Sequence, residues 1–365
     1  MKRLRFIPFV ILLFVGLILG AIAPQEVLSA PEDAKPIELI FSTWTPPVKS
    51  PDTIVVNNWL DEVEKRTKGK VHFTRHYAGA LGRPPDQITL AQQGIADVSF
   101  CVASIAGRYP MTILLSLPWL FPSSTVATKV VSQLWLEFPE LQRDFPRVKT
   151  VAVGTTDVFM PFFVDKVTKM EDMKGMKIRV GGVMDKVVES LGGVPVGMNI
   201  VDVYMSLQKG ILQGIISGWN TVRAFKFGEV CKNYPVWEGN AMSIFTYSLS
   251  MNLNTWNKLP PDVKKVIDEL NSGGADSWFA KMSGPIYDKA SVGALNFARG
   301  KGGEIYKIDK SEIARWIEKT RPVVNKIIKE AEAKGLPAKR LIERTRALSI
   351  EYTKGIPDFK INLVK

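Results

Sequence analysis

The chain has 365 residues and a mass of 40.6 kDa, which is enough for one large domain or two ordinary domains with filled cores. Hydrophobic residues make up 46% and charged residues 23% of the sequence, a balance that excludes a mostly disordered chain and a membrane protein with many spans. The formal net charge is +12, but the basic residues are scattered and no nucleic-acid-binding motif accompanies them. We therefore predict a globular protein with a solvated basic surface and no nucleic-acid partner.

The first thirty residues have the pattern of an export signal. Three basic residues, Lys2, Arg3 and Arg5, precede an apolar run over residues 6–23. We expect a signal peptide over residues 1–30 with cleavage near Ala30. The apolar run is also long enough for an uncleaved N-terminal anchor, so that alternative stays open.

Only two cysteines are present, Cys101 and Cys231, and they lie far apart in the sequence. An exported protein can form disulfides, so one long-range bridge is an open alternative. We favour two buried free thiols, because free cysteine is among the residue types most often buried.

The first part of the mature chain alternates strands with helices. The sequence predicts a strand over residues 37–43, a helix over 52–66 and a strand over 70–77. A short helix over 85–93, closed by a glycine, and a strand over 96–102 follow. This order is typical of a parallel-rich α/β sheet.

The middle of the chain repeats the alternation and predicts a second sheet. Strands are expected over residues 150–154, 158–164, 177–180 and 211–216, with helices between the later ones. A strand over 243–252 is expected to return the chain to the first sheet. Those intervening helices cover residues 184–191 and 203–209.

Beyond residue 261 the pattern is helical, with one β-like interruption over residues 303–308. A helix is expected over residues 311–334 with a bend at Pro322. No functional interpretation of residues 336–365 follows from the sequence.

The sequence carries no recognisable short motif of catalysis or metal binding. His72 and His76 lie on a predicted strand, where four residues span about 13 Å, too far for two ligands of one zinc ion. The segment Gly214–Gly218 has its serine one place late for a nucleophile elbow, and no dinucleotide or phosphate-binding loop is present. We therefore expect no metal, no cofactor and no catalysis. A secreted α/β enzyme stays as an alternative, since paired carboxylates cannot be picked out from the sequence.

Several segments resemble, in order along the chain, the solute receptors of tripartite ATP-independent periplasmic (TRAP) transporters, the C4-dicarboxylate-binding DctP-like family. The two most informative segments are Met173–Val180 and Gly192–Gly214. Shorter matching segments lie within residues 67–82, 93–98 and 117–121. Each segment is weakly specific alone, and their common order makes the resemblance specific over about residues 36–330.

The resemblance implies a two-lobed periplasmic-binding-protein fold of the Venus flytrap type, an α/β fold with two mixed sheets flanked by helices and a hinge and cleft between them. Lobe I would comprise residues 31–156 and 246–288, and lobe II residues 157–245 and 289–365. It further implies a periplasmic receptor that binds a small organic acid in the cleft and delivers it to the membrane subunits of a TRAP transporter. A sensory binding domain for an anionic ligand is a further alternative.

Arg179 matches the position of the family's ligand-anchoring arginine. It lies near a strand end, where open α/β sheets bind ligands, and its planar guanidinium can hold a carboxylate by two parallel hydrogen bonds. The alternative is a structural salt bridge. Many relatives carry a second arginine in the preceding strand, whereas Phe159–Phe163 has no basic residue. This difference suggests an apolar pocket around a single carboxylate and an apolar or aromatic acid as ligand.

Five further residues are candidate ligand contacts. Trp219 and Asn220 follow a strand where the family places ligand-facing residues, and Ser42 and Trp44 lie at the end of the first strand. Phe159 is the fifth candidate. For the three aromatic residues, packing in the core is the alternative interpretation.

Overall fold

The computed structural model describes residues 35–103, 108–356, 358 and 360. The predicted export signal over residues 1–30 lies outside the described residues. From Pro36 onward the chain forms one compact unit. In the part of the chain that the structure describes, no helix is both long and apolar enough to cross a membrane.

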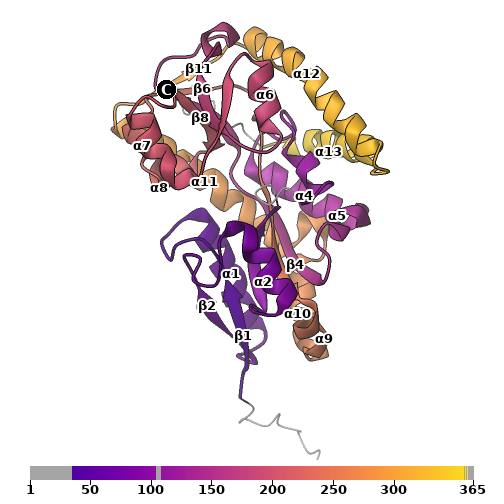
Figure 1. Ribbon diagram of the computed structural model, residues 1–365. Coiled ribbons are helices and arrows are strands. Elements are labelled where there is room, and N and C mark those ends of the chain that lie inside the picture. Colours follow the sequence, from indigo (N-terminus) through magenta and orange to yellow (C-terminus); the bar gives the residue numbers. More distant parts are fainter. Residues whose placement is uncertain (1–34, 104–107, 357, 359, 361–365) are drawn as a thin grey trace, which may run out of the picture. The chain divides into compact units, whose positions relative to one another are not determined.

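The first sheet has five strands in the order β2-β1-β3-β10-β4. Three of them, β1, β2 and β4, are labelled in Figure 1. β1 is parallel to β2 and to β3, whereas β10 is antiparallel to β3 and β4. The late strand β10 therefore returns the chain to the first sheet, as the sequence predicted. The strands are β1 (Ile37–Ser42), β2 (Val71–His76), β3 (Val98–Val102), β4 (Val148–Thr155) and β10 (Thr246–Asn252).

The helix between β1 and β2 shows how local sequence sets an element. α1 (Pro51–Arg66) begins at Ser50, whose hydroxyl accepts a hydrogen bond from the Thr53 backbone N–H, and a proline occupies its first turn. Its buried side chains, among them Trp59 and Val63, recur at helical spacing and pack on the sheet. The parallel β–α–β order follows from this helix.

The second sheet has six strands in the order β11-β9-β5-β8-β6-β7. β6 is parallel to β7 and β8, β11 is parallel to β9, and β5 is antiparallel to both of its neighbours, so the sheet is mixed. The strands are β5 (Phe159–Phe163), β6 (Lys177–Val180), β7 (Val194–Gly197), β8 (Gly214–Gly218), β9 (Asn233–Val236) and β11 (Glu304–Lys307).

Strand β8 begins three residues later than residue 211, where the sequence predicted its start. The chain first closes helix α7 (Val203–Gln208), with Gly210 in the left-handed conformation at φ 71°. The backbone N–H groups of Ile211 and Leu212 both donate to the carbonyl of Ser206. These two residues thus end the helix and are not available to the sheet.

The remaining α-helices cover both sheets and fill the C-terminal third. They are α2 (Gln87–Gln93), α4 (Ser124–Glu137), α5 (Pro139–Arg143), α6 (Met184–Ser190), α8 (Asn220–Ala224), α9 (Leu253–Lys258), α10 (Pro261–Asn271), α11 (Trp278–Gly300), α12 (Lys310–Glu332) and α13 (Ala338–Thr353). Short 3-10 turns cover Pro84–Asp86, Thr112–Ser116, Met170–Met173, Ile200–Asp202, Phe227–Glu229 and Gly274–Asp276. The sequence did not predict α4.

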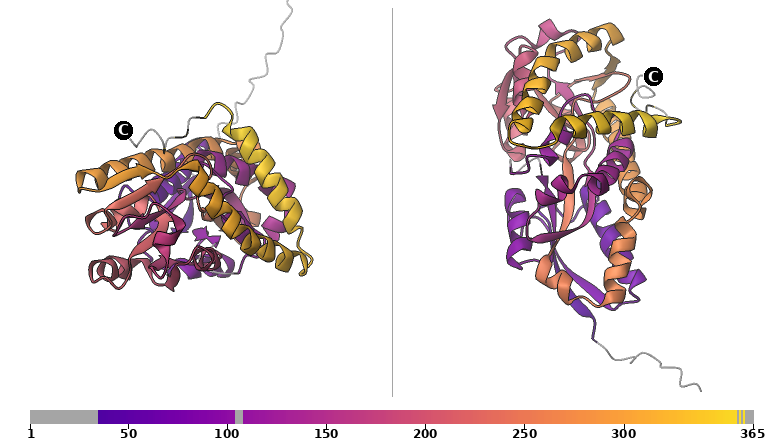
Figure 2. Two further views of the ribbon diagram at one scale, coloured as in Figure 1. Left: turned by 90° about the horizontal axis from the view of Figure 1, so that it is seen from above. Right: turned by 90° about the vertical axis from the view of Figure 1, so that its right-hand side faces the viewer.

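Two long helical segments connect the sheets. α11 contacts α1 and β4 of the first sheet and α8 and β11 of the second (Figure 1). α12 meets α13 at an angle (Figure 2), and α13 packs in turn against α4, which lies on β4. The predicted assignment of residues 289–365 to lobe II therefore includes a helix, α13, that packs beside the first sheet.

The chain passes between the sheets at two short crossover segments, residues 156–158 and residues 237–245, and a third time between β10 and β11, through α9, α10 and α11. The first crossover and the start of β5 are hydrogen-bonded to the second crossover: the N–H of Thr156 donates to the carbonyl of Phe245 at 2.8 Å, and that of Phe159, the first residue of β5, to the carbonyl of Ser243 at 2.8 Å. A pair of adjacent, bonded crossovers is the structural basis of a hinge.

Both cysteines are buried and free, which confirms the prediction of two thiols and rules out the disulfide alternative. Burial raises the pKa of Cys101 to about 11 and that of Cys231 to about 12. Neither thiol is ionised near neutral pH, so neither is a reactive nucleophile.

Candidate functional site

In the first sheet, the predicted ligand-binding residues lie at the edge where the parallel strands end. Ser42 is the last residue of β1, and Trp44 follows two residues later. Because β10 runs antiparallel to β3, its first residue, Thr246, lies at the same edge and pairs with Thr155 at the end of β4. Open α/β sheets bind ligands at such an edge.

The second sheet presents a matching edge. Val180 ends β6 and Gly218 ends the parallel strand β8, while the antiparallel β5 begins at this edge with Phe159 paired to Gly218. Thr155 and Phe159 are joined by the first crossover, and four peptide units span at most about 14 Å. The two edges that carry the predicted residues therefore adjoin each other.

Arg179 lies on β6 between Val196 of β7 and Ile215 of β8. Its neighbours in the strand, Ile178 and Val180, are buried on the opposite face, so the guanidinium is on the other face of the sheet. The Nε atom donates to the carbonyl of Met198 at 3.2 Å, and the described residues offer no hydrogen bond to the two terminal nitrogens. Those nitrogens are the pair that would hold a carboxylate.

Arg179 differs from the other arginines that are not exposed. Within the described ranges these are Arg75 and Arg344, and each is paired with carboxylates, Arg75 with Asp61 and Arg344 with Glu137. Among the described residues, Arg179 is the half-buried arginine without a carboxylate within ion-pair distance. The salt-bridge alternative for Arg179 therefore finds no partner in the described structure.

The acid whose charge acts on Arg179 is Asp185, in the first turn of α6. Burial lowers the pKa of the Arg179 guanidinium and the charge of Asp185 raises it, with a net lowering. Burial also raises the pKa of Asp185, as does the charge of Glu189, and the Oδ1 atom of Asp185 is buried without a hydrogen bond from any described residue. An arginine stays protonated in spite of such shifts, so the site keeps its positive charge.

Trp219 and Asn220 follow β8 directly. The Trp219 side chain is fully buried, and its ring packs 5.1 Å from that of Phe162 and 6.2 Å from that of Tyr234. This position in the core is the alternative that the sequence left open, and it differs from the predicted ligand-facing one. Asn220 is half-buried at the start of α8, and its side chain makes no hydrogen bond to other described residues.

A residue that sequence reasoning missed holds this segment. The carboxylate of Asp157, in the first crossover, accepts a hydrogen bond from the backbone N–H of Asn220 at 2.6 Å. Asp157 is buried, and burial raises its pKa to about 8. The sequence does contain a signal that could have drawn attention to Asp157: it is the one charged residue between Lys149 and Asp165.

The other three candidates lie along the two edges. Phe159 is buried, with its ring 4.5 Å from that of Phe245 on the second crossover, and Trp44 is half-buried 6.5 Å from Phe100. Ser42 Oγ and Trp44 Nε1 are buried atoms without a hydrogen-bond partner in the described structure. Unsatisfied polar atoms are uncommon in protein interiors, and these two lie at the predicted ligand edge.

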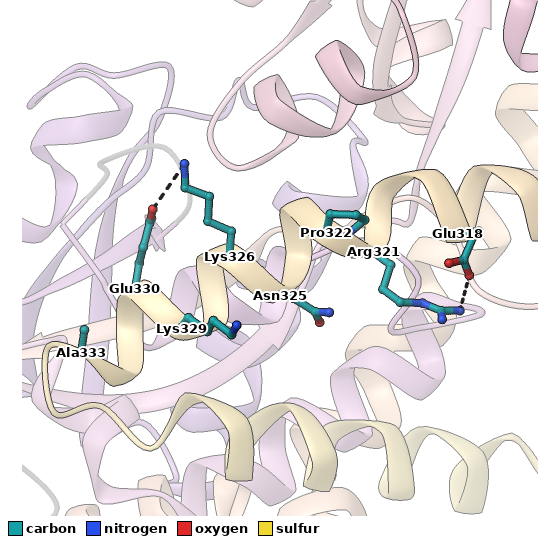
Figure 3. A pocket seen from close by; sticks show the side chains of 8 residues that line it. All are labelled: Glu318, Arg321, Pro322, Asn325, Lys326, Lys329, Glu330 and Ala333. Carbon is teal, nitrogen blue, oxygen red and sulfur yellow. Dashed lines mark ion pairs between the residues drawn. The ribbon is translucent and has the colours of Figure 1, made fainter.

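A separate pocket lies along α12 and is lined by residues of that helix from Glu318 onward and by Ala333, which directly follows it (Figure 3). Arg321 pairs there with Glu318 at 2.7 Å, and Lys326 with Glu330 at 3.9 Å. None of its residues comes from either strand edge. No group of three potential metal ligands occurs within residues 35–103 or 108–356, which include His72 and His76.

The family of this protein is shown by comparison with known protein families. Residues 41–331 match the family DctP, described as bacterial extracellular solute-binding protein, family 7. The chain belongs to this family. The match confirms the resemblance found in the sequence, and it spans both sheets up to the end of α12.

Individual family members show the same relationship over most of their length. The C4-dicarboxylate-binding periplasmic protein DctP of Rhodobacter capsulatus is 23% identical over 334 residues, which cover 89% of this chain and 96% of that protein. The members of this family are solute-binding proteins, and this chain is one of them.

Solved structures of TRAP solute-binding proteins confirm the fold class. One from Desulfovibrio salexigens is 28% identical, with a TM-score of 0.78 over 90% of this chain and 100% of that chain. A second, from an unidentified marine microbe, is specific for aromatic acid ligands and was solved with metahydroxyphenylacetate. It is 26% identical, with a TM-score of 0.79 over 87% of this chain and 99% of that chain.

Proposed function

We propose that this family 7 receptor binds a small aromatic or apolar monocarboxylate at Arg179, in the periplasm, and delivers it to the membrane subunits of a TRAP transporter. The observation that carries the proposal is the half-buried Arg179 guanidinium, which has no carboxylate partner among the described residues. A buried cation without a counter-ion favours an anionic ligand, because a carboxylate restores the charge pairing that burial requires.

A single carboxylate fits the charges at the site better than two. Strand β5, which lies in the same sheet as β6 and is separated from it by β8, carries Phe159, Met160, Phe162 and Phe163, all buried, and no base. A dicarboxylate would need a second cation to replace the lost hydration of its second charge. The aromatic-acid specificity of the 26% identical receptor is in line with this interpretation.

The remaining predicted residues take supporting roles in this proposal. Trp44 and Phe159 supply apolar surface to the ring of the ligand, and Ser42 and Asn220 are hydrogen-bonding groups for a polar substituent. Trp219 does not contact the ligand in this proposal. Its buried ring packs against Phe162 and so holds the end of β8 in place. Closing the two strand edges over the ligand would exclude water from the Arg179 ion pair.

A ligand panel tests the substrate class. Residues 31–365 are screened by thermal shift and titration calorimetry against benzoate, phenylacetate, 3-hydroxybenzoate, succinate and malate, after native mass spectrometry has shown whether a ligand co-purifies. At a ligand concentration of one hundred times the Kd, a binder of the folded state adds about 2.7 kcal/mol of stability. We expect stabilisation by the aromatic monocarboxylates. Stabilisation by succinate or malate alone would contradict the proposed class.

Substitution of Arg179 tests the anchor. Arg179→Ala is expected to weaken binding by about 2 to 5 kcal/mol, the usual effect of removing one partner of a buried charge pair. Arg179→Lys is expected to rescue little, because an ammonium cannot form the two parallel hydrogen bonds. Arg344→Ala is the matched control, since that guanidinium is already paired with Glu137. Unchanged affinity in Arg179→Ala would place the carboxylate elsewhere.

A further inference from the structure

Asp157 is a carboxyl group buried in the hinge without a cation. It is 1% exposed, and it has no ion pair with any described residue. The ionisable groups whose charge raises its pKa are Asp52 of α1 and Asp288 of α11, both of which are acids. Asp157 therefore lies in surroundings that oppose its negative charge.

The neighbouring acids are satisfied by other groups. Asp52 accepts a hydrogen bond from the Tyr287 hydroxyl at 2.6 Å. Asp288 accepts from the backbone N–H groups of Ser124 and Thr125 at the start of α4, at 2.8 and 3.0 Å. Neither competes for the hydrogen bond that Asp157 makes, and burial together with these acids holds the pKa of Asp157 at about 8.

The contacts of Asp157 lead to the end of β8. Its Oδ2 atom accepts the Asn220 N–H, and its Oδ1 atom lies so close to Gly218 that a Cβ placed there would be 2.1 Å away. One side chain of the first crossover thus touches the residues on both sides of Trp219. The Asn220 side chain is half-buried, makes no hydrogen bond to another described residue, and extends from the backbone that Asp157 holds.

We infer that Asp157 is a positioning residue for ligand binding: it holds the Gly218–Asn220 segment against the hinge, so that Asn220 is presented to the ligand in one orientation. The inference rests on the proposed function, in which Asn220 contacts the ligand. A residue that only caps α8 would affect stability, whereas Asp157 sets ligand affinity through the position of Asn220.

Two substitutions at Asp157 separate these roles, with benzoate and 3-hydroxybenzoate as probes in calorimetry. Asp157→Asn keeps a neutral acceptor of similar shape, and its affinity is expected to stay within about threefold of the unchanged protein. Asp157→Val removes the acceptor and is expected to weaken binding at least tenfold, while circular dichroism shows a folded protein. Adding Asn220→Ala to Asp157→Val should cause little further loss, because the two residues act in series.

The pH profile provides a readout that a structural role would not change. Above about pH 8, ionised Asp157 places a negative charge beside the segment that receives an anion, so affinity should fall several-fold between pH 7 and pH 9 in the unchanged protein. Asp157→Asn should show no such fall. Should Asp157→Val fail to fold, the comparison of the two pH profiles still decides the inference.

Asp144→Asn is the matched control, since Asp144 is also a buried carboxylate that accepts backbone hydrogen bonds, from Met111 and Thr112. It should leave both affinity and pH profile unchanged. Folded Asp157→Val that binds as tightly as the unchanged protein would overturn the inference and leave the proposed function intact. Absence of binding by the unchanged protein, or unaltered binding by Arg179→Ala, would instead overturn the proposed function.

Discussion

Arg344 of α13 donates two hydrogen bonds to the carboxylate of Glu137 on α4, from Nε at 2.7 Å and from Nη2 at 2.8 Å. The pair joins helices that are more than 200 residues apart in the sequence. Because both side chains are partly exposed, we expect Arg344→Ala to lower the free energy of unfolding by about 1 kcal/mol or less. Urea unfolding measures this loss. A much larger loss would mean that the docking of α13 depends on this pair.

Asp185 is expected to weaken ligand binding. Its charge acts on Arg179, and an anion bound to Arg179 would meet the same charge. Asp185→Asn removes it, and we expect binding about threefold to tenfold tighter, an advantage that shrinks as salt is raised. Calorimetry at low and high salt measures the effect. Glu330→Gln on α12 makes the same change of charge away from the site, and it should not alter affinity. Weaker binding in Asp185→Asn would show that Asp185 orients the arginine.

Stability should depend on pH through Asp157. Its pKa lies near the ordinary value of 3.8 in the unfolded chain and at about 8 in the folded protein, so folding takes up a proton between these values. The contribution of Asp157 to stability is therefore greatest below about pH 4 and is lost progressively as the pH rises to about 8. Asp157→Asn removes this dependence.

The measurement is urea unfolding of the unchanged protein and Asp157→Asn at pH 5, 7 and 9. The advantage of the variant should grow from pH 5 to pH 8 and stay constant above it. Taking the difference in the free energy of unfolding between the two proteins removes the contribution of all other titrating groups, because they are common to both. Parallel profiles would mean that Asp157 titrates in the ordinary range.

Gly218 should not tolerate a side chain. The Cβ of Gly218→Ala would lie 2.1 Å from Asp157 Oδ1, so the carboxylate or β8 must shift, and we expect a loss of about 1 to 3 kcal/mol. Gly293→Ala on α11 is the control, because that helical glycine is exposed and has nothing within 4 Å of the added Cβ. It should stabilise the protein by about 0.5 to 1 kcal/mol. Thermal unfolding of both variants measures the contrast, and equal behaviour would contradict the close packing at Gly218.

Most strands and the longer helices other than α4 could be predicted because their signals are local, whereas the short strands β7 and β9 were not predicted. The β–α–β opening follows from periodicity and from the Ser50 cap, and the helix stop at Gly94 follows from its left-handed conformation at φ 73°. α4 was missed for a physical reason: nearly all of its faces are buried between β4, α11 and α13, so it lacks the polar face that reveals an amphipathic helix. The late start of β8 depends on hydrogen bonds to Ser206, which no periodicity reveals.

The site could be predicted only as a set of candidates. Its position near a strand end and the family resemblance pointed to Arg179. That no described carboxylate lies within ion-pair distance of Arg179 could not be predicted, because folding decides which residues surround it. Sequence could not decide between the core and the ligand for Trp219, because a tryptophan after a buried strand satisfies both patterns. Asp157 and Asn220 are 63 residues apart, so their hydrogen bond is a product of the tertiary fold. The roles of Arg179, Asn220, Ser42, Trp44 and Phe159 stay predictions until binding is measured.

The hydrogen bonds between the two crossovers, from Thr156 to Phe245 and from Phe159 to Ser243, restrict how the receptor can move. Two strands of backbone that are bonded to each other twist as one ribbon, whereas sliding would break both bonds. Ligand uptake should therefore turn the two sheets about this ribbon rather than slide one past the other. Amide hydrogen exchange at Thr156 and Phe159 should be equally slow with and without ligand, even where exchange at the flanking strand edges changes.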